Sequence, residues 1–521
     1  MLSAVSLTFF APIVLLAVAG AAMARPGRRP GRLPVWSEMA ALVSLALTAV
    51  GFVQFFVSGP MQVGILDGTM LLALRADLVS VTLGLLVAFI GWIVLRYSRS
   101  YLDGEAREGA FHGLMLATLA AVLIFVQSAS LWALVLGTFL VGLSLRRLLL
   151  FYAVRAEARR AATKFAIVWH AGDAALIVAT VLLVARYGTA DLTALETMAA
   201  QNGLTPAGAI AVALVVLAAA LKTAAFPLHG WLTEVMEAPT PVSALLHAGI
   251  INSGGVLLIS MAGLIQQSPG AMAALVMLGG FSALFGAAVM LTQSAVKTAL
   301  AWSTVSQMGF MLLQCGLGLW ALALLHIVAH SLYKAHAFLS SGGAVGAVAG
   351  IRRPGPVAVP NLGAVLKSFA LAVGLYALIA ASFTLLVGPK SAQALALGAI
   401  LIFGVAYLVA QGLADLAPAD LTSRTGLSAL IAAVAYFSLQ AGADLLWGPV
   451  LPPVPAAGPL EWALILLAVA SFGLVAFAQA LFPLWAHHPA SAGLRVHLAN
   501  GLYLNALLDR AIGGFQTAKS N

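Results

Sequence analysis

The chain has 521 residues, of which 62% are hydrophobic and 8% are charged, and its formal net charge is +9. Soluble globular domains carry about 25% charged residues and disordered chains have low hydrophobicity, so this composition excludes both classes. A single cysteine, Cys315, excludes a disulfide framework and a cysteine-ligated iron–sulfur cluster within the chain. The sequence therefore predicts an all-α polytopic membrane protein.

Apolar segments long enough to cross a bilayer, which takes about 20 mostly apolar residues, recur along the whole chain. On this criterion we predict about fifteen transmembrane helices. They lie at residues 2–24, 36–58, 73–95, 111–128, 130–151, 164–185, 206–226, 239–262, 270–291, 297–316, 319–346, 368–388, 391–413, 426–446 and 460–482. The first could instead be a secretory signal ending near Ala24, but arginines follow it directly, which is the reverse of a signal peptide.

The basic residues predict the orientation of the chain, because the cytoplasmic connections of membrane proteins are enriched in Lys and Arg. With the N-terminus outside, the inward connections hold most of the 26 Lys and Arg residues, and this set includes Lys164 and extends to Arg352, Arg353 and Lys519. The outward side holds few of them, namely Arg75, Arg186 and Lys390. We therefore expect a multi-pass protein of the cell inner (plasma) membrane, with a cytoplasmic C-terminus, lipid around it and no nucleic-acid partner.

Two ionisable residues fall inside the sixth and seventh predicted spans, where a charge at mid-bilayer costs about 2.5–3.5 kcal/mol. Asp173 lies in the sixth span and Lys222 in the seventh. Pro227 follows Lys222 and is predicted to break the helix, and broken helices at membrane depth line cavities. We expect Asp173 and Lys222 to belong to a path for protons or cations. The alternative is a static ion pair that holds two helices together.

Histidines and a second lysine extend this candidate path. His247 lies in the eighth span, and His326, His330 and Lys334 recur at i, i+4 and i+8 in the eleventh, which places them on one helix face. Histidine titrates near neutral pH and relays protons through either ring nitrogen. The alternatives are ordinary histidines bonded between helices, or a shared metal, although no carboxylate or cysteine in that span completes a metal site. We expect no catalytic or metal site in this chain.

The remaining histidines receive no role in the path. Those within or beside the spans are His112, His170, His229 and His336, and those expected at the membrane interface are His487, His488 and His497. Beyond the last span, residues 494–510 show the spacing of an amphipathic helix that lies on the bilayer or docks a partner. Its apolar positions, which we predict to form the docking face, are Leu494, Leu498, Leu502, Leu504 and Leu508.

Three sequence blocks resemble the signature of the antiporter-like subunits of respiratory complex I and Mrp antiporters. They are residues 222–232 (KTAAFPLHGWL), 237–249 (EAPTPVSALLHAG) and 296–309 (VKTALAWSTVSQMG). The resemblance covers roughly residues 110–345. It implies an inverted pair of five-helix repeats, each with a broken helix, and a role in moving protons or Na⁺. The implied division is 1–110 (first three helices), 111–262 (first repeat), 270–413 (second repeat), 426–482 (last two helices) and 483–521 (cytoplasmic amphipathic tail).

The chain departs from that family at two informative places. The family's fifth span has Trp-Glu, whose glutamate pairs with the lysine of the seventh span, whereas Thr138 and Phe139 stand here. This leaves Asp173 as the expected partner of Lys222. The family's twelfth span breaks at a lysine or glutamate. Here the nearest candidate break is at Pro389 and Lys390, and the alternative is an outer loop.

The missing glutamate, the short length and the tail together resemble the DabB family, the membrane subunits of two-component inorganic carbon pumps. This resemblance implies a large cytoplasmic zinc-binding DabA-like partner with a carbonic-anhydrase-like site, so zinc is expected in the partner and no cofactor in this chain. The expected function is proton (or Na⁺) translocation that drives uptake of CO₂ or bicarbonate. The alternatives are a proton-pumping subunit of an NADH-quinone oxidoreductase, an Mrp-type cation/proton antiporter, or a non-translocating anchor.

Overall fold

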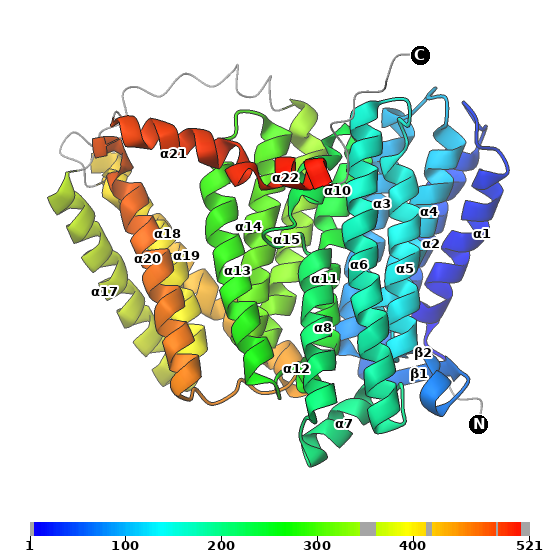
Figure 1. Cartoon of the computed structure of the whole chain (residues 1–521), viewed down its shortest axis with the longest axis horizontal. Coiled ribbons are helices and arrows are strands. Elements are labelled where there is room, and N and C mark those ends of the chain that lie inside the picture. Colours follow the sequence, from blue (N-terminus) through cyan, green and yellow to red (C-terminus); the bar gives the residue numbers. More distant parts are fainter. Residues whose placement is uncertain (1–4, 344–360, 413–418, 486–487, 512–521) are drawn as a thin grey trace.

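The computed structural model describes residues 5–343, 361–412, 419–485 and 488–511, which form a bundle of helices. The long helices run between two opposite faces, with the N-terminus at the lower face of Figure 1 and the C-terminus at the upper face. The residues Arg352, Arg353, His487 and Lys519, which were assigned above, lie outside the described residues.

The N-terminal part contains an element that the sequence did not predict, a two-stranded antiparallel hairpin. Its elements are η1 (Leu7–Phe10), α1 (Ala11–Met23), α2 (Leu33–Ser58), β1 (Met61–Ile65), η2 (Gly68–Met70), β2 (Leu72–Ala76) and α3 (Leu78–Tyr101). The predicted span 73–95 therefore begins too early. The reason is local: Asp77 Oδ1 accepts from the Ser80 amide at 2.8 Å and Ser80 Oγ accepts from the Asp77 amide at 2.9 Å, a reciprocal cap that starts α3 at Leu78.

The central part holds the most buried helices. Its elements are α4 (Glu108–Val126), α5 (Leu131–Leu149), α6 (Ala156–Tyr187), α7 (Leu192–Asn202), α8 (Pro206–Lys222), α9 (Gly230–Thr233), η3 (Val235–Glu237), α10 (Thr240–Ala248), η4 (Ile250–Asn252), α11 (Ser253–Ser260), α12 (Ala262–Ile265), α13 (Pro269–Met290), α14 (Val296–Gly316), α15 (Trp320–Ser340) and η5 (Ser341–Gly343). In the most apolar 18 residues of the α10–α11 segment, 94% of the residues are buried, whereas the share is 17% in the peripheral α17 and in α20. Polar side chains on α10, α11 and their neighbours are thus held away from lipid.

The C-terminal part completes the bundle and ends on its upper face. Its elements are α17 (Leu362–Leu386), α18 (Ala392–Gly412), α19 (Ala419–Trp447), η6 (Gly448–Val450), α20 (Pro459–Trp485), α21 (Pro489–Ala499), η7 (Gly501–Tyr503) and α22 (Leu504–Ala511). Among the described residues, 11 helices are long and apolar enough to span a membrane, and three shorter apolar helices accompany them. The class of polytopic helical membrane protein is confirmed, while the count of fifteen and the division into repeats stay predictions.

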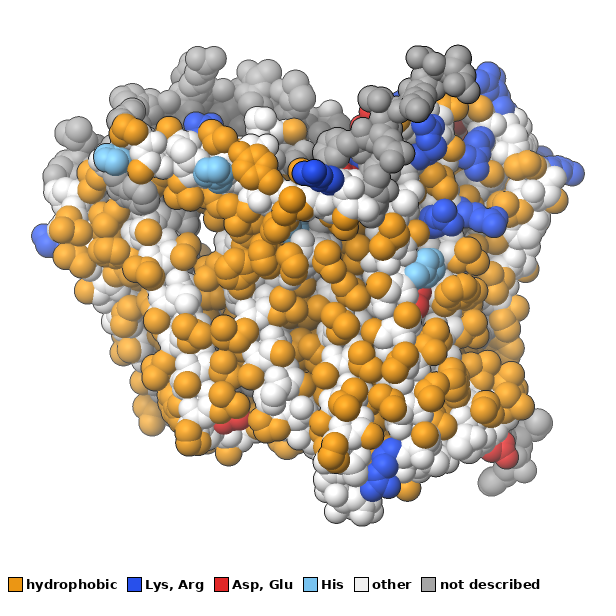
Figure 2. All heavy atoms as spheres, viewed as in Figure 1, with side chains coloured by type: hydrophobic (Ala, Val, Ile, Leu, Met, Phe, Trp, Pro, Cys, Tyr) orange, Lys and Arg blue, Asp and Glu red, His pale blue; other side chains and the backbone are white. Residues whose placement is uncertain are grey.

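Apolar side chains cover the middle of the surface in Figure 2, while Lys and Arg gather along the upper edge. The upper edge carries the connections between α1 and α2, α3 and α4, and α5 and α6, which are rich in arginine. We call this upper face the basic face. Exposed Leu, Val, Ile and Phe side chains on α1, α2, α17 and α20 form the belt that suits a bilayer.

The C-terminal segment corrects the prediction of one continuous amphipathic helix over 494–510. It bends at η7, where Leu502 has a left-handed backbone (φ 53°), and α22 continues in a new direction. The five predicted docking leucines consequently do not share one face. Leu494 and Leu502 are exposed, whereas Leu498, Leu504 and Leu508 are half-buried.

Candidate ion-translocation site

The seventh span is broken directly after Lys222. Helix α8 ends at Lys222, the chain leaves the helix with a left-handed Ala224 (φ 51°), and α9 begins at Gly230. The freed amides find other partners: Ala225 N bonds to the Ala220 carbonyl at 3.1 Å, and Phe226 N donates to Ser282 Oγ on α13 at 3.0 Å. Pro227 therefore lies inside the break and not at its start. The residue before a proline disfavours the helical conformation, so Pro227 keeps Phe226 out of a helix.

Lys222 and Asp173 form a buried ion pair, as the sequence predicted them to meet. Lys222 Nζ donates to Asp173 Oδ1 at 2.5 Å, and the two residues are 0% and 3% exposed. The ammonium also lies 4.2 Å from the centroid of the Trp169 indole. A cation and an anion in this buried contact neutralise each other, and each compensates for the cost of burying the other.

His170, to which the sequence gave no role, continues this pair towards the surface of the bundle. Its Nδ1 lies 2.8 Å from Asp173 Oδ2, and its side chain is 35% exposed. The ring of Phe139 lies 5.6 Å from the His170 ring, so the position of the family's missing glutamate borders this histidine. The signal was present in the sequence, because His170 and Asp173 are one helical turn apart. Lys222, Asp173 and His170 form a chain of titratable groups from the core to the surface.

The predicted stripe on the eleventh span is a single face of α15. His326 Nδ1 lies 3.0 Å from Gln314 Oε1, and the rings of His326 and His330 are 6.0 Å apart. Lys334 is 0% exposed, and its Nζ donates to the Leu300 carbonyl at 3.0 Å and to Ser303 Oγ. Both bonds of Lys334 go to neutral oxygens, which leaves its charge uncompensated by these contacts. Both ring nitrogens of His330 lack a partner within the described part of the chain.

His247 lies beside this stripe, on a span that is itself broken. Its Nδ1 is 3.1 Å from Thr304 Oγ1, and its ring stacks on Phe338 of α15 at 4.3 Å. The predicted eighth span over 239–262 corresponds to a candidate span at Thr240–Ser260. Inside it, α10 ends at Ala248 and α11 begins at Ser253, with η4 between them. Asn252 substitutes for the lost helix contacts: its Nδ2 donates to the Ala248 carbonyl at 3.1 Å and to Ser331 Oγ at 2.9 Å.

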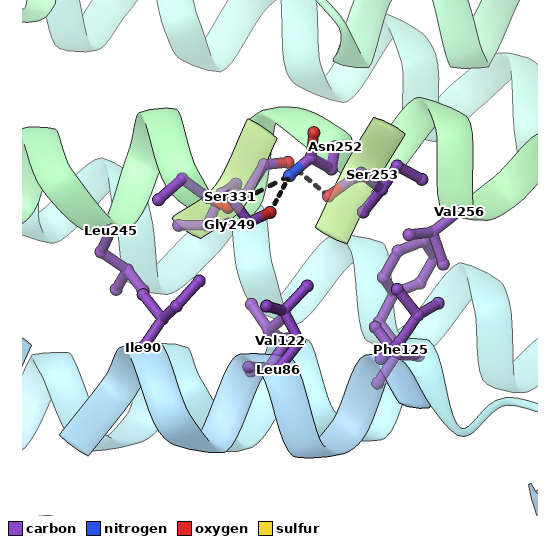
Figure 3. A pocket seen from close by; sticks show the side chains of 16 residues that line it. Leu86, Ile90, Val122, Phe125, Leu245, Gly249, Asn252, Ser253, Val256 and Ser331 are labelled. Carbon is purple, nitrogen blue, oxygen red and sulfur yellow. Dashed lines mark hydrogen bonds between the residues drawn. The ribbon is translucent and has the colours of Figure 1, made fainter. Parts of the chain in front are cut away.

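Figure 3 shows the break from close by, with Asn252 and Ser331 facing an apolar wall formed by Leu86, Ile90, Val122 and Phe125. The cavity between them has a volume of about 20 Å³, room for one water molecule. Apolar side chains of α3 and α4 therefore border the polar groups of the break, Asn252 and Ser331.

Gly254 holds the broken span against α8, and this close approach gives a stability prediction. A Cβ at Gly254 would lie 2.2 Å from the Ala219 carbonyl oxygen and 2.6 Å from Thr223 Cγ2. Gly254→Ala is therefore expected to lower the free energy of unfolding by about 1–3 kcal/mol, as overpacking does. Thermal or denaturant unfolding in detergent measures this, with Gly280→Ala as the control because a Cβ there meets nothing within 4 Å. Equal stability of the two variants would contradict the proposed packing.

A second buried ion network, which the sequence did not reveal, lies towards the basic face. Lys164 Nζ contacts Glu234 Oε1 at 2.6 Å, Asp509 Oδ1 at 2.6 Å and Asn505 Oδ1 at 2.7 Å, and its side chain is 0% exposed. Arg160 lies within 4 Å of both carboxylates. The sequence assigned Lys164 to the orientation signal because it adjoins an apolar run. Its two carboxylate partners lie 70 and 345 positions away in the chain.

The structure thus brings Asp173 and Lys222 into contact and gathers His247, His326, His330 and Lys334 around α15, while Pro389 belongs to neither group. Pro389 and Lys390 lie in the connection between α17, which ends at Leu386, and α18, which begins at Ala392. The expected helix break at Pro389 is wrong, and the alternative of a loop holds. Over the described ranges, no group of three or more His, Cys, Asp and Glu side chains is placed to hold a metal ion.

Comparisons with known proteins identify relatives of this chain and structures with a similar fold. The family model "NADH:quinone oxidoreductase/Mrp antiporter, TM" matches residues 128–353. The chain is 35% identical over 509 residues to the probable inorganic carbon transporter subunit DabB2 of Halothiobacillus neapolitanus, covering 94% of this chain and 89% of that protein. NADH-quinone oxidoreductase subunit L of Mycobacterium tuberculosis is 36% identical over 281 residues, 53% of this chain and 44% of that protein. A structure of the Mrp complex from Dietzia sp. DQ12-45-1b superposes with a TM-score of 0.61 at 21% identity, over 98% of this chain and 59% of that one, which confirms an antiporter-like fold.

Proposed function

Because this chain belongs to the DabB family of inorganic carbon transporter subunits, within the antiporter-like proteins, we propose that it translocates protons (or Na⁺) to drive inorganic carbon uptake. The observation that carries the proposal is the Lys222–Asp173 pair, a buried lysine and carboxylate at 2.5 Å where a spanning helix is broken. Ionisable groups at membrane depth are costly and mark ion paths. The break supplies backbone that lines such a path.

The arrangement of charges supports a switch at this pair. A proton that arrives through His170 neutralises the Asp173 carboxylate, and the contact at 2.8 Å is short enough for direct transfer. Lys222 then loses its counter-charge in a buried site, which favours release of its own proton. His247 and the α15 stripe of His326, His330 and Lys334 are the next stations.

We assign the basic face to the cytoplasm, since arginine-rich connections face inward in membrane proteins. The ion gradient would supply free energy, and a cytoplasmic partner would use it for one-way hydration of CO₂ to bicarbonate. Such coupling requires that ion movement in this chain and catalysis in the partner each bias the other. The partner is a large zinc-binding DabA-like subunit, and it would hold the zinc and carry out the hydration.

Purification of the chain from its native membrane tests the proposal through the partner that accompanies it. We expect a soluble zinc protein to co-purify and expect the two chains together to raise bicarbonate accumulation at low CO₂. Collapse of the proton gradient and of the Na⁺ gradient in separate experiments identifies the ion. Co-purification with flavin and iron–sulfur subunits would instead assign the chain to a quinone oxidoreductase. Accumulation that persists after both gradients are collapsed would contradict ion coupling.

A further inference from the structure

The C-terminal segment covers the broken seventh span on the basic face. In Figure 1, α21 runs along this face from α20 towards α13, and α22 follows it. Contacts at four residues fix the segment over residues 499–510. The Ala499 carbonyl accepts from Gln293 Nε2 at 3.3 Å, a Cβ on Gly501 would lie 3.2 Å from the Trp302 ring, and Asn505 and Asp509 enter the Lys164 network.

His229 lies directly beneath this segment, seven residues after Lys222. Its ring is surrounded by Phe226, Phe285 and Trp302, with centroids 6.1, 5.6 and 4.8 Å away. It is 1% exposed, and neither of its ring nitrogens has a partner in the described part of the chain. A buried imidazole with two unpartnered nitrogens is unfavourable, and such groups in native structures call for an explanation.

Residues 499–510 lie directly over His229 on the basic face. A Cβ on Gly501 would lie 3.8 Å from His229 Nε2, and Gly501 itself is buried. Asn505 packs on the first residue of α9, since a Cβ on Gly230 would lie 2.1 Å from Asn505 Oδ1. Removal of residues 499–510 would therefore open His229 to water at the basic face and would release α9.

The docked segment has strained backbone. Leu502 and Tyr503 both have left-handed conformations, with φ of 53° and 62°, which residues with a Cβ adopt at a cost. This strain persists because Asp509 and Asn505 bind the fully buried Lys164, and Asn505 Nδ2 also donates to Glu234. A conformation that is strained in the middle and held at its end by one ion network is suited to release.

We propose that residues 499–510 form a removable cap on the ion path, and that His229 beneath it is the group through which protons pass between the path and the basic face. The proposal rests on the proposed function for the identity of the ion. Asp509 and Asn505 are positioning residues, because they act by holding the cap on Lys164 and Glu234. A soluble partner that binds the exposed side of the cap would control access to His229.

Labelling of a cysteine at position 229 tests the cap without any transport measurement. In a His229→Cys, Cys315→Ser chain within inside-out vesicles, a membrane-impermeant maleimide is expected to react slowly. Adding Asp509→Asn removes the carboxylate that holds Lys164, and labelling should become faster by about tenfold or more. Arg510→Gln, an exposed charge on the same helix, is the control and should leave the rate unchanged. Equal rates with and without Asp509→Asn would overturn the proposal.

A crosslink tests whether the cap must move. The Cβ atoms of residues 230 and 505 would lie 3.4 Å apart, close to the spacing of a disulfide. In a Gly230→Cys, Asn505→Cys, Cys315→Ser chain with its partner, oxidation should reduce bicarbonate accumulation by about tenfold or more, and a reductant should restore it. Undiminished accumulation by the crosslinked chain would overturn the removable cap. A wild-type complex that accumulates no bicarbonate would count against the proposed function, while the labelling rates still decide the cap.

Discussion

Asp173→Ala is expected to lower the free energy of unfolding by about 3–5 kcal/mol and to abolish bicarbonate accumulation at low CO₂. The substitution leaves the Lys222 ammonium buried without its counter-charge, which is the costly way to disrupt a buried pair. Unfolding in detergent gives the first quantity, and accumulation by cells that express the chain with its partner gives the second. Glu237→Ala is the control, because the Arg155–Glu237 pair is largely exposed and should contribute less than about 1 kcal/mol.

A double variant separates the relay from a static ion pair. Asp173→Leu combined with Lys222→Met replaces both charges by apolar side chains of similar size, and such replacements are often neutral or stabilising. We expect the double variant to recover the stability lost in Asp173→Ala and to remain unable to transport. If accumulation returned together with stability, the pair would be structural and the relay through Asp173 would be wrong.

Lys334→Arg is expected to reduce ion-driven accumulation by at least about 10²-fold while the bundle remains folded. Arginine keeps the positive charge but does not release a proton, so it preserves electrostatics and removes proton transfer. The measurement is accumulation normalised to the amount of chain in the membrane. Lys297→Arg is the matched control, since Lys297 bonds to Thr240 Oγ1 at 3.0 Å outside the α15 stripe. Wild-type transport by Lys334→Arg would leave Lys334 only a structural role.

The sequence predicted the parts of the site that follow from the cost of charge in an apolar span. Asp173 and Lys222 were found because few ionisable residues interrupt those spans, and the α15 stripe because helical periodicity is regular. The sequence did not predict the break in the eighth span. At that break the Asn252 side chain bonds to Ser331 of a distant helix, a contact that local sequence patterns do not report.

The basic-face network escaped prediction for a related reason. Lys164 adjoins an apolar run and so resembles an ordinary orientation signal, and its burial depends on Asp509 near the other end of the chain. The bend at Leu502 that brings Asp509 there is likewise set by tertiary contacts and not by the regular apolar spacing of residues 494–510. Sequence patterns report local periodicity well, but they do not report which distant segments meet.

The Lys222–Asp173 pair also constrains how the protein is made. Helix α8 has 17 residues and ends at a lysine, and α6 carries an aspartate, so each helix alone would enter the bilayer with an uncompensated charge. Each such charge costs about 2.5–3.5 kcal/mol during insertion. The two helices are close in sequence, with only α7 between them. Lateral release of α6 from the insertion machinery is therefore most favourable after α8 has been synthesised, when the two helices enter the lipid as a neutral unit.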